Sequence, residues 1–175
     1  RKNIFGIGLN YTDHVAESAR ALDTAKTLPQ QPVIFSKPPT TVIGPGDPIR
    51  HDAAITAQLD WEVELAVILG TTARRVDKAQ ALSHVFGYSV MIDISARDNR
   101  RAGQWIYSKG MDSYAPFGPC IVTADEIPDP QDLTLWLTVN GVEKQRDTTR
   151  HMLFDAAHLI HDISQGITLE PGDII

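Results

Sequence analysis

The chain contains one cysteine, Cys120, and no apolar run that approaches the roughly 20 residues of a membrane-spanning helix. A single cysteine cannot form an internal disulfide, which favours a reducing compartment such as the cytoplasm. Lysine and arginine form no cluster and the formal net charge is −6, so the sequence lacks the basic footprint of a nucleic-acid-binding protein. We therefore expect a cytoplasmic protein that binds neither nucleic acid nor membrane.

Composition and length indicate one ordinary globular domain. The 175 residues are 42% hydrophobic and 22% charged, which is enough apolar material to bury a core within a single domain. We expect this domain to occupy residues 1–175. We also expect it to continue past the last residue, because residues 169–175 have the pattern of a strand that is only beginning.

Apolar periodicity and turn residues predict a fold dominated by strands. The pair Asn140-Gly141 suits the type I′ turn of a hairpin, and Ala81, Leu82 and Val85 have the spacing of the buried face of a helix. The expected strands are residues 4–9, 33–36, 60–69, 133–139 and 142–146, and the expected helices are residues 77–85 and 154–164. Helices interspersed among strands predict the α+β class with a mostly antiparallel or mixed sheet.

Three carboxylates lie within apolar runs. Glu62 and Glu64 occur in the alternating run of residues 60–69, so on a strand their side chains project from the same face. Asp93 lies in a second apolar run. Like charges held this close repel each other unless water solvates the face or a cation lies between them. Three carboxylates suit a hard divalent ion such as Mg²⁺, although a Glu-x-Glu pair by itself more often marks a solvated strand face.

Five segments in order carry a more specific signal: residues 8–17, 61–70, 87–98, 108–119 and 169–175. Together they resemble the catalytic domain of the fumarylacetoacetate hydrolase superfamily over nearly the whole chain. The resemblance implies a mixed β-sheet rolled into a sandwich or barrel with a few short helices, a homodimer, and Mg²⁺ or Mn²⁺ held by Glu62, Glu64 and Asp93. In that family a further segment that lines the site follows the last motif, so the site in this chain would be incomplete.

The resemblance also implies catalytic roles. His14 and Glu17 match the family's His–Glu dyad, in which the carboxylate orients an imidazole that activates the attacking water. On spacing alone these two residues would be an ordinary surface pair on one helix. Lys109 matches the family's active-site lysine, whose fixed charge would stabilise an enolate. Residues 15–31 lack a strong apolar period, and we expect them to form a lid.

Three further residues are predicted to bind substrate: Tyr11, Arg97 and Arg100. Arg97 matches a family arginine that would clamp a carboxylate or support Asp93, although an arginine beside Asp98 is equally consistent with a structural ion pair. Many family members carry glutamine where this chain has Arg100. A guanidinium facing the pocket at that position would favour a substrate with a second acidic group.

The predicted reaction is metal-dependent hydrolysis of a C–C bond in a 2,4-diketo acid of the acylpyruvate type, which presents an oxo-carboxylate to the ion. Decarboxylation or isomerisation of an unsaturated oxo diacid, of the 2-hydroxyhepta-2,4-diene-1,7-dioate type, needs the same ion but no activated water. His14 and Glu17 therefore favour hydrolysis. The alternative outside enzymes is a binding module whose catalytic parts have decayed, and the presence of the matching residues argues against it.

Overall fold

The structure, a computed structural model, describes residues 2–12 and 28–175. His14, Glu17 and most of the predicted lid lie outside the described residues. The strands are β1 (Ile4–Gly8), β2 (Val33–Lys37), β3 (Val42–Ile43), β4 (Leu59–Asp60), β5 (Val63–Leu69), β6 (Val85–Ile92), β7 (Ser95–Ala96), β8 (Ala115–Thr123), β9 (Thr134–Val139) and β10 (Val142–Thr148). The helical segments are η1 (Pro39–Thr41), η2 (Lys78–His84), η3 (Arg97–Asn99), α2 (Ile106–Lys109), η4 (Ala124–Glu126), η5 (Thr149–His151) and α3 (Ala156–Gly166).

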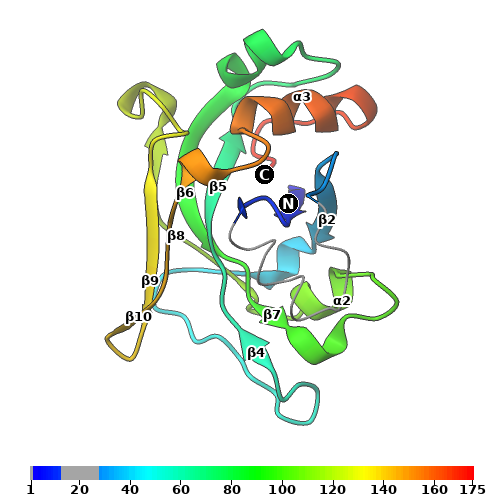
Figure 1. The fold of residues 1–175 in the computed structure, drawn as a ribbon, viewed down its shortest axis with the longest axis vertical. Coiled ribbons are helices and arrows are strands. Elements are labelled where there is room, and N and C mark those ends of the chain that lie inside the picture. Colours follow the sequence, from blue (N-terminus) through cyan, green and yellow to red (C-terminus); the bar gives the residue numbers. More distant parts are fainter. Residues whose placement is uncertain (1, 13–27) are drawn as a thin grey trace.

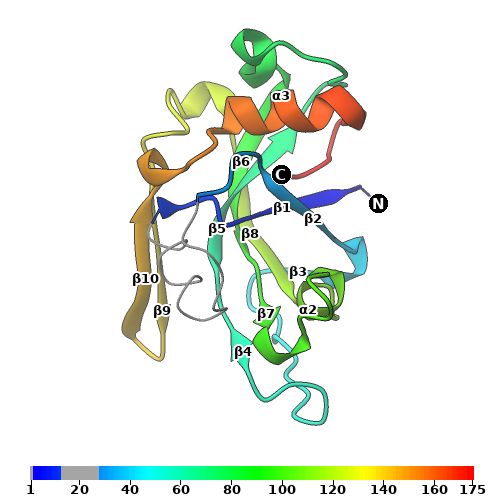
Figure 2. The ribbon, with the colours of Figure 1, turned by 45° about the vertical axis from the view of Figure 1, so that its right-hand side comes forward.

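The long strands form one curled surface (Figures 1 and 2). Strands β5, β6 and β8 pair antiparallel in that order, and β3 joins β8 in parallel. On the other side of β5, the Phe5 N–H donates to the Ile174 carbonyl (2.8 Å), and Val67 and Ile175 exchange backbone hydrogen bonds. Because β1 also pairs with β2, the C-terminal residues connect the two groups of strands.

Helix α3 lies across one end of the curled sheet in both views (Figures 1 and 2). Leu159, Ile160 and Ile163 on this helix are buried in the main apolar cluster of the molecule. The helix starts two residues later than predicted, because Asp155 is its N-cap and accepts a hydrogen bond from the His158 N–H (2.7 Å). Packing of its apolar face therefore covers the sheet at this end.

The hairpin of β9 and β10 confirms the turn prediction. Asn140 has φ 52° and Gly141 has φ 77°, which is the pair of positive angles that a type I′ turn requires. The β9–β10 hairpin lies beside the curled sheet (Figure 2). Four consecutive residues of β10, residues 144–147, line the cavity described below.

The helix predicted at residues 77–85 is present, but its buried face differs from the prediction. The segment forms the 3₁₀ helix η2, in which Ala81 is fully buried as expected but Leu82 is 40% exposed, and Val85 already begins β6. Three residues per turn, instead of 3.6, bring a different set of side chains to the buried face.

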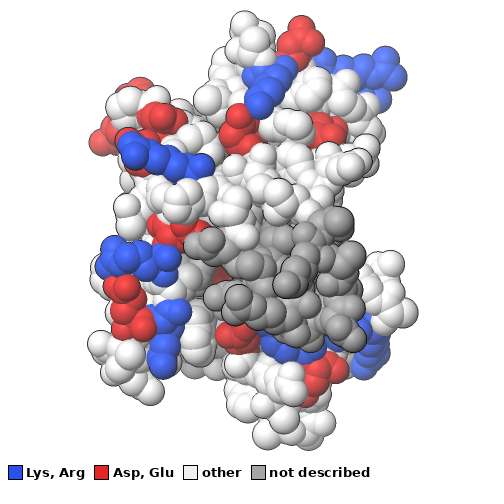
Figure 3. Space-filling view, in the orientation of Figure 1, with Lys and Arg blue, Asp and Glu red and all other residues white. Residues whose placement is uncertain are grey.

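These elements confirm the predicted class: the fold is α+β, with a mixed sheet curled into a half-barrel and a few short helices. Within the described residues, no helix is both long and apolar enough to cross a membrane. On the face drawn in Figure 3, acidic and basic side chains of the described residues are intermingled.

Candidate active site

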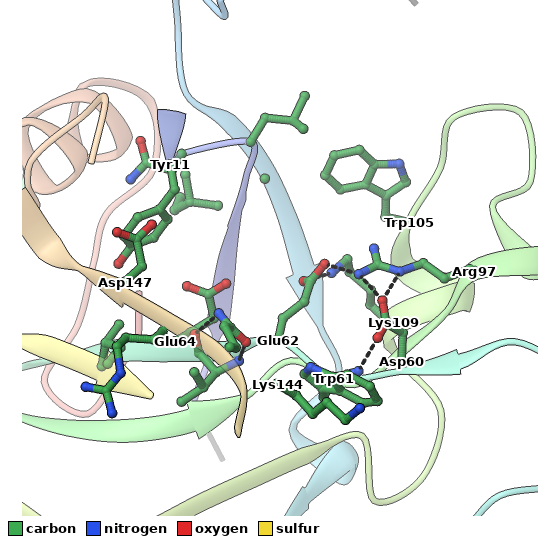
Figure 4. A pocket seen from close by; sticks show the side chains of 18 of the residues that line it. Tyr11, Asp60, Trp61, Glu62, Glu64, Arg97, Trp105, Lys109, Lys144 and Asp147 are labelled. Atoms are coloured by element: carbon green, nitrogen blue, oxygen red, sulfur yellow. Dashed lines mark hydrogen bonds and ion pairs between the residues drawn. The ribbon is translucent and has the colours of Figure 1, made fainter. Parts of the chain in front are cut away.

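The predicted strand over residues 60–69 is interrupted beside its carboxylates. Strand β4 ends at Asp60 and β5 begins at Val63, so Glu62 lies in the gap and Glu64 is the second residue of β5. Both glutamates nevertheless line one cavity of about 420 Å³, as the shared-face prediction required (Figure 4). The break directs Glu62 toward α2 and η3, where its charged partners lie.

Lys109, the last residue of α2, joins two of the predicted metal ligands. Its Nζ donates to Glu62 Oε2 (2.6 Å), to Asp93 Oδ2 (2.5 Å) and to the Ser95 hydroxyl (2.8 Å). The residue is only 4% exposed. Burial acts to lower the pKa of Lys109, but the Asp93 and Glu62 carboxylates outweigh burial and raise it, so the ammonium stays charged.

A second buried lysine, Lys37, was not singled out from the sequence. Its Nζ donates to Asp93 Oδ1 (2.6 Å) and to the Lys109 carbonyl, so each oxygen of Asp93 accepts from a different lysine. Burial lowers the pKa of Lys37, and the Asp93 charge only partly opposes it. Strand alternation could have indicated this residue, because Phe35 and Lys37 share the inward face of β2 and the Phe35 ring lies 5.1 Å from Lys109 Nζ.

Arg97 supports Glu62 rather than Asp93, and it does not pair with the neighbouring Asp98. Its Nη2 donates to Glu62 Oε1 (2.6 Å) and its Nε donates to Asp60 Oδ2 (2.8 Å) (Figure 4). Asp98 instead accepts from the Ala57 N–H (2.9 Å) and from a threonine hydroxyl. Glu62 is therefore held by a cation on each of its two oxygens, Arg97 on one and Lys109 on the other.

Glu64 differs from the other two carboxylates, because no side chain of the described residues donates a hydrogen bond to it. Burial, followed by the charges of Glu62 and Asp93, raises the pKa of Glu64 well above its ordinary value. In this conformation, no three His, Cys, Asp or Glu side chains within residues 2–12 and 28–175 stand close enough together to hold a metal ion. Lys109, which contacts Glu62 and Asp93, supplies the positive charge between those two.

The donor set still fits a hard divalent ion. Glu62, Glu64 and Asp93 offer only carboxylate oxygens, which are the ligands that Mg²⁺ and Mn²⁺ prefer, and Glu62 and Glu64 line the same cavity. Asp93 lines a smaller adjoining cavity of about 70 Å³, which Glu64 also lines. Glu64 receives no side-chain hydrogen bond from the described residues, so a bound cation would favour its ionised form.

The remainder of the cavity has an aromatic side and a hydroxyl-bearing side. Trp61 and Trp105 contribute aromatic rings, whereas Tyr11 lies beside Asp147 and near Glu64 (Figure 4). Burial, followed by the Glu64 charge, raises the pKa of Tyr11, so its phenol remains a hydrogen-bond donor.

Arg100 lines the same cavity. Its guanidinium carbon lies 5.9 Å from the centre of the Trp105 ring. Burial, followed by the nearby charge of Arg97, lowers its pKa, but an arginine in a protein remains charged. In contrast to Arg97, no carboxylate of the described residues forms an ion pair with Arg100.

The predicted site residues therefore fall into three groups. The large cavity brings together Tyr11, Glu62, Glu64, Arg97, Arg100 and Lys109. Asp93 reaches this group through Lys109. His14 and Glu17 lie outside the described residues. Five further residues that contact the site or line a cavity there were not predicted from the sequence: Lys37, Asp60, Trp105, Gln145 and Asp147.

Comparison with known proteins gives a consistent family. Residues 3–175 match the family described as Fumarylacetoacetate (FAA) hydrolase C-terminal. A Burkholderia ambifaria protein that is provisionally named a hydrolase is 46% identical over 172 residues, which cover 97% of this chain and 58% of that protein. The chain thus spans little more than half the length of the curated relatives that it matches.

Solved structures with the same fold carry the names of different activities. The fumarylacetoacetate hydrolase of Exiguobacterium antarcticum is 42% identical with a TM-score of 0.86, covering 99% of this chain and 61% of its own. The 2-hydroxyhepta-2,4-diene-1,7-dioate isomerase of Mycobacterium marinum is 38% identical with a TM-score of 0.85, covering 99% of this chain and 62% of its own. Overall likeness therefore does not discriminate between hydrolysis and isomerisation.

Proposed function

The chain belongs to the fumarylacetoacetate hydrolase family, and we propose that it is a Mg²⁺- or Mn²⁺-dependent enzyme that hydrolyses a C–C bond in an acylpyruvate-like 2,4-diketo acid. The observation that carries this proposal is the convergence of Glu62, Glu64 and Lys109 on one cavity, with Asp93 bonded to Lys109. The cavity, of about 420 Å³, has a size typical of small-molecule sites.

Glu62, Glu64 and Asp93 would hold the divalent ion. Carboxylate oxygens each accept more than one interaction, so Glu62 and Asp93 can keep their contacts with Lys109 while they bind an ion. When bound, the ion polarises the carbonyl groups of the oxo acid and stabilises negative charge on its enolate. Arg97 and Lys37 would keep the two paired carboxylates oriented.

Lys109 would stabilise the charge that develops during cleavage. Water adds to the acyl carbonyl, the bond from that carbon to C3 of the substrate breaks, and its electron pair passes to the pyruvate enolate. Protonation at C3 then releases pyruvate and a carboxylic acid. A buried ammonium that remains charged is suited to the enolate oxygen, because it is fixed before the reaction begins.

The attacking water requires a base, and we assign this role to His14 with Glu17 as its orienting carboxylate, from their match to the family's dyad. Tyr11 would donate a hydrogen bond to the substrate, since its phenol stays protonated in the cavity. Arg100 would bind an acidic group on the acyl portion, because its guanidinium lines the cavity without an ion-pair partner among the described residues.

The test is an ultraviolet assay of substrate consumption with and without Mg²⁺, using a panel of acylpyruvates, unsaturated oxo diacids and oxaloacetate. We expect Mg²⁺-dependent loss of an acylpyruvate together with release of pyruvate. His14→Ala should lower turnover by roughly 10²–10⁴-fold, the usual contribution of a positioned base. His84→Ala is a matched control, because His84 bonds to Thr71 and does not line the cavity. Full turnover in His14→Ala would contradict the assigned water activation.

Isomerisation or decarboxylation is the second candidate, because a solved structure that is 38% identical carries the name of an isomerase. It predicts consumption of an unsaturated oxo diacid or of oxaloacetate without release of an acyl acid. Because this route activates no water, full turnover in His14→Ala would favour it. The same substrate panel therefore separates the two reactions.

A further inference from the structure

The side-chain amide of Gln145, on strand β10 of the hairpin, bonds to the backbone of strand β5. The Val63 N–H donates to Gln145 Oε1 (2.8 Å), and Gln145 Nε2 donates to the Val63 carbonyl (3.1 Å). Val63 is the residue between Glu62 and Glu64. The amide of Gln145 therefore forms two hydrogen bonds with the backbone of the residue that separates two proposed metal ligands.

The opposite edge of β5 shows why this contact is needed. There Val63 is aligned with Ile92 of β6, and the Asp93 N–H donates to the Glu62 carbonyl (2.7 Å). Backbone groups of successive residues on a strand point to alternate edges, so the N–H and carbonyl of Val63 face away from β6. Val63 is 5% exposed, and a buried backbone pair needs partners. Gln145 supplies both.

A β-bulge in β10 lies immediately before Gln145 and affects the direction of its side chain. The pairing passes from Glu143 opposite Thr138 to Gln145 opposite Leu137, so Lys144 is an extra residue in β10. A bulge bends its strand and redirects the side chains next to it. Gln145 and its neighbours, residues 144–147, all line the cavity.

We propose that Gln145 is a positioning residue that sets the separation and direction of the Glu62 and Glu64 carboxylates by fixing the peptide groups of Val63. This inference rests on the proposed function, because it assumes that these carboxylates share an ion. Rotation of either Val63 peptide group would swing one glutamate relative to the other. Two hydrogen bonds from one planar amide restrain both groups at once.

The test compares Mn²⁺ binding in the purified full chain and in Gln145→Met, which keeps the length of the side chain but removes its donor and acceptor. We expect Mn²⁺ affinity to fall by about 10-fold or more, the usual effect of losing a group that orients metal ligands, together with an altered Mn²⁺ electron paramagnetic resonance spectrum. Glu143→Gln is the matched control. It breaks an exposed ion pair with Arg146 on the same strand and leaves the Val63 contact intact, so its affinity and spectrum should equal those of the wild type.

The outcomes separate the two claims. Equal affinity and spectrum in the wild type and in folded Gln145→Met overturn this inference and leave the proposed function standing. Absence of Mn²⁺ binding in the wild type overturns the proposed function and this inference with it. If circular dichroism shows that Gln145→Met is unfolded, Gln145→Asn carries the same test. That variant retains an amide whose reach is one methylene too short, so weakened Mn²⁺ binding is expected and wild-type binding would contradict the inference.

Discussion

Strands β5 and β6 have different surroundings at their two ends, apolar at one and charged at the other. Near α3 they bury apolar side chains against the helix, and we call this region the apolar end; its members include Val67, Leu69, Tyr88, Leu159, Ile160 and Ile163. Near α2 the same strands carry or adjoin a buried set of charges, which we call the ionic end; it comprises Lys37, Glu62, Glu64, Asp93, Arg97 and Lys109.

The difference separates what stabilises this fold from what equips it for chemistry. Apolar side chains gain stability on burial without needing a specific partner. Buried ions lose hydration, and their mutual attraction offsets that loss only when the geometry is good. The ionic end is consequently a poor way to hold a sheet together. Its presence is explained if the same groups bind and stabilise an anionic substrate.

The largest effect is expected when the ionic end loses its central cation. Lys109→Met should leave the Glu62 and Asp93 carboxylates without that partner, lowering the metal-free free energy of unfolding by about 3–5 kcal/mol. It should also lower turnover by roughly 10²–10³-fold. Added Mg²⁺ should restore stability but not turnover. Urea unfolding with and without Mg²⁺, beside the assay, measures both.

Lys144→Met is the control for that experiment, since Lys144 is an exposed lysine that lines the same cavity. We expect its stability to stay within about 0.5 kcal/mol of the wild type. An equal loss of stability in both lysine variants would contradict the distinction between a structured ion cluster and a solvated surface charge.

A substitution at the apolar end should change stability without changing turnover or metal affinity. Ile160 is fully buried beneath the sheet, so Ile160→Ala should lower the free energy of unfolding by about 2–5 kcal/mol through lost contacts and the resulting cavity. Turnover and Mg²⁺ affinity per folded molecule should be unchanged, and Mg²⁺ should not selectively rescue this variant. A metal affinity that fell in parallel with stability would show that the two ends are coupled.

Arg100→Gln should change selectivity more than activity. A charge-assisted hydrogen bond contributes about 1.5–3 kcal/mol, so kcat/KM for an acylpyruvate with a carboxylate on its acyl group should fall by roughly 10–100-fold. A neutral acylpyruvate of equal length should be almost unaffected. Arg101→Gln is the control, because Arg101 stacks on Tyr107 and does not line the cavity. Equal losses on both substrates would refute the role of Arg100 in selecting an acidic group.

The smallest effect is expected at the start of α3. Burial acts to raise the pKa of Asp155, but its contacts with Lys78 and the His158 N–H outweigh burial and hold the pKa below its ordinary value. Because the folded-state pKa lies below the unfolded value of about 3.9, this stabilisation is present above that pH and is lost as the pH falls through the folded pKa. Asp155→Ala should cost about 1 kcal/mol at neutral pH.

Urea unfolding at descending pH checks this prediction. The difference between wild type and Asp155→Ala should shrink as the solution becomes acidic. Asp155→Asn, which retains the cap but loses the pair with Lys78, should fall between them. A difference that stayed constant with pH would contradict the role of the carboxylate charge.

The sequence predicted local features with strong chemical signatures. Asn140-Gly141 identified the hairpin because few residues tolerate two successive positive φ angles, and the spacing of Leu159, Ile160 and Ile163 identified α3. The break between β4 and β5 was not predicted, since residues 60–69 alternate without interruption. A helix at residues 77–85 was predicted, but its 3₁₀ type was not, because apolar spacing over one or two turns is compatible with either kind of helix.

The candidate site was predictable where residues fall within the family motifs or, like Arg100, close beside them. Glu62, Glu64 and Lys109 lie in those motifs, and the cavity brings them together. Lys37 and Gln145 act through contacts across 56 and 82 residues of sequence, which no local pattern encodes. The partners of Arg97 likewise depended on the tertiary fold, which placed Asp60 and Glu62 nearer than Asp98.

The most direct test of the central claim is a calorimetric titration with Mn²⁺ of the wild type, Glu64→Gln and Glu143→Gln. Glu64 is the carboxylate without a bonded cation among the described residues, whereas Glu143 is exposed and paired with Arg146. We predict saturable binding of one ion per chain in the wild type and in Glu143→Gln, and loss of saturable binding in Glu64→Gln. Unchanged Mn²⁺ affinity in Glu64→Gln would contradict the assignment of the ionic end as a metal site.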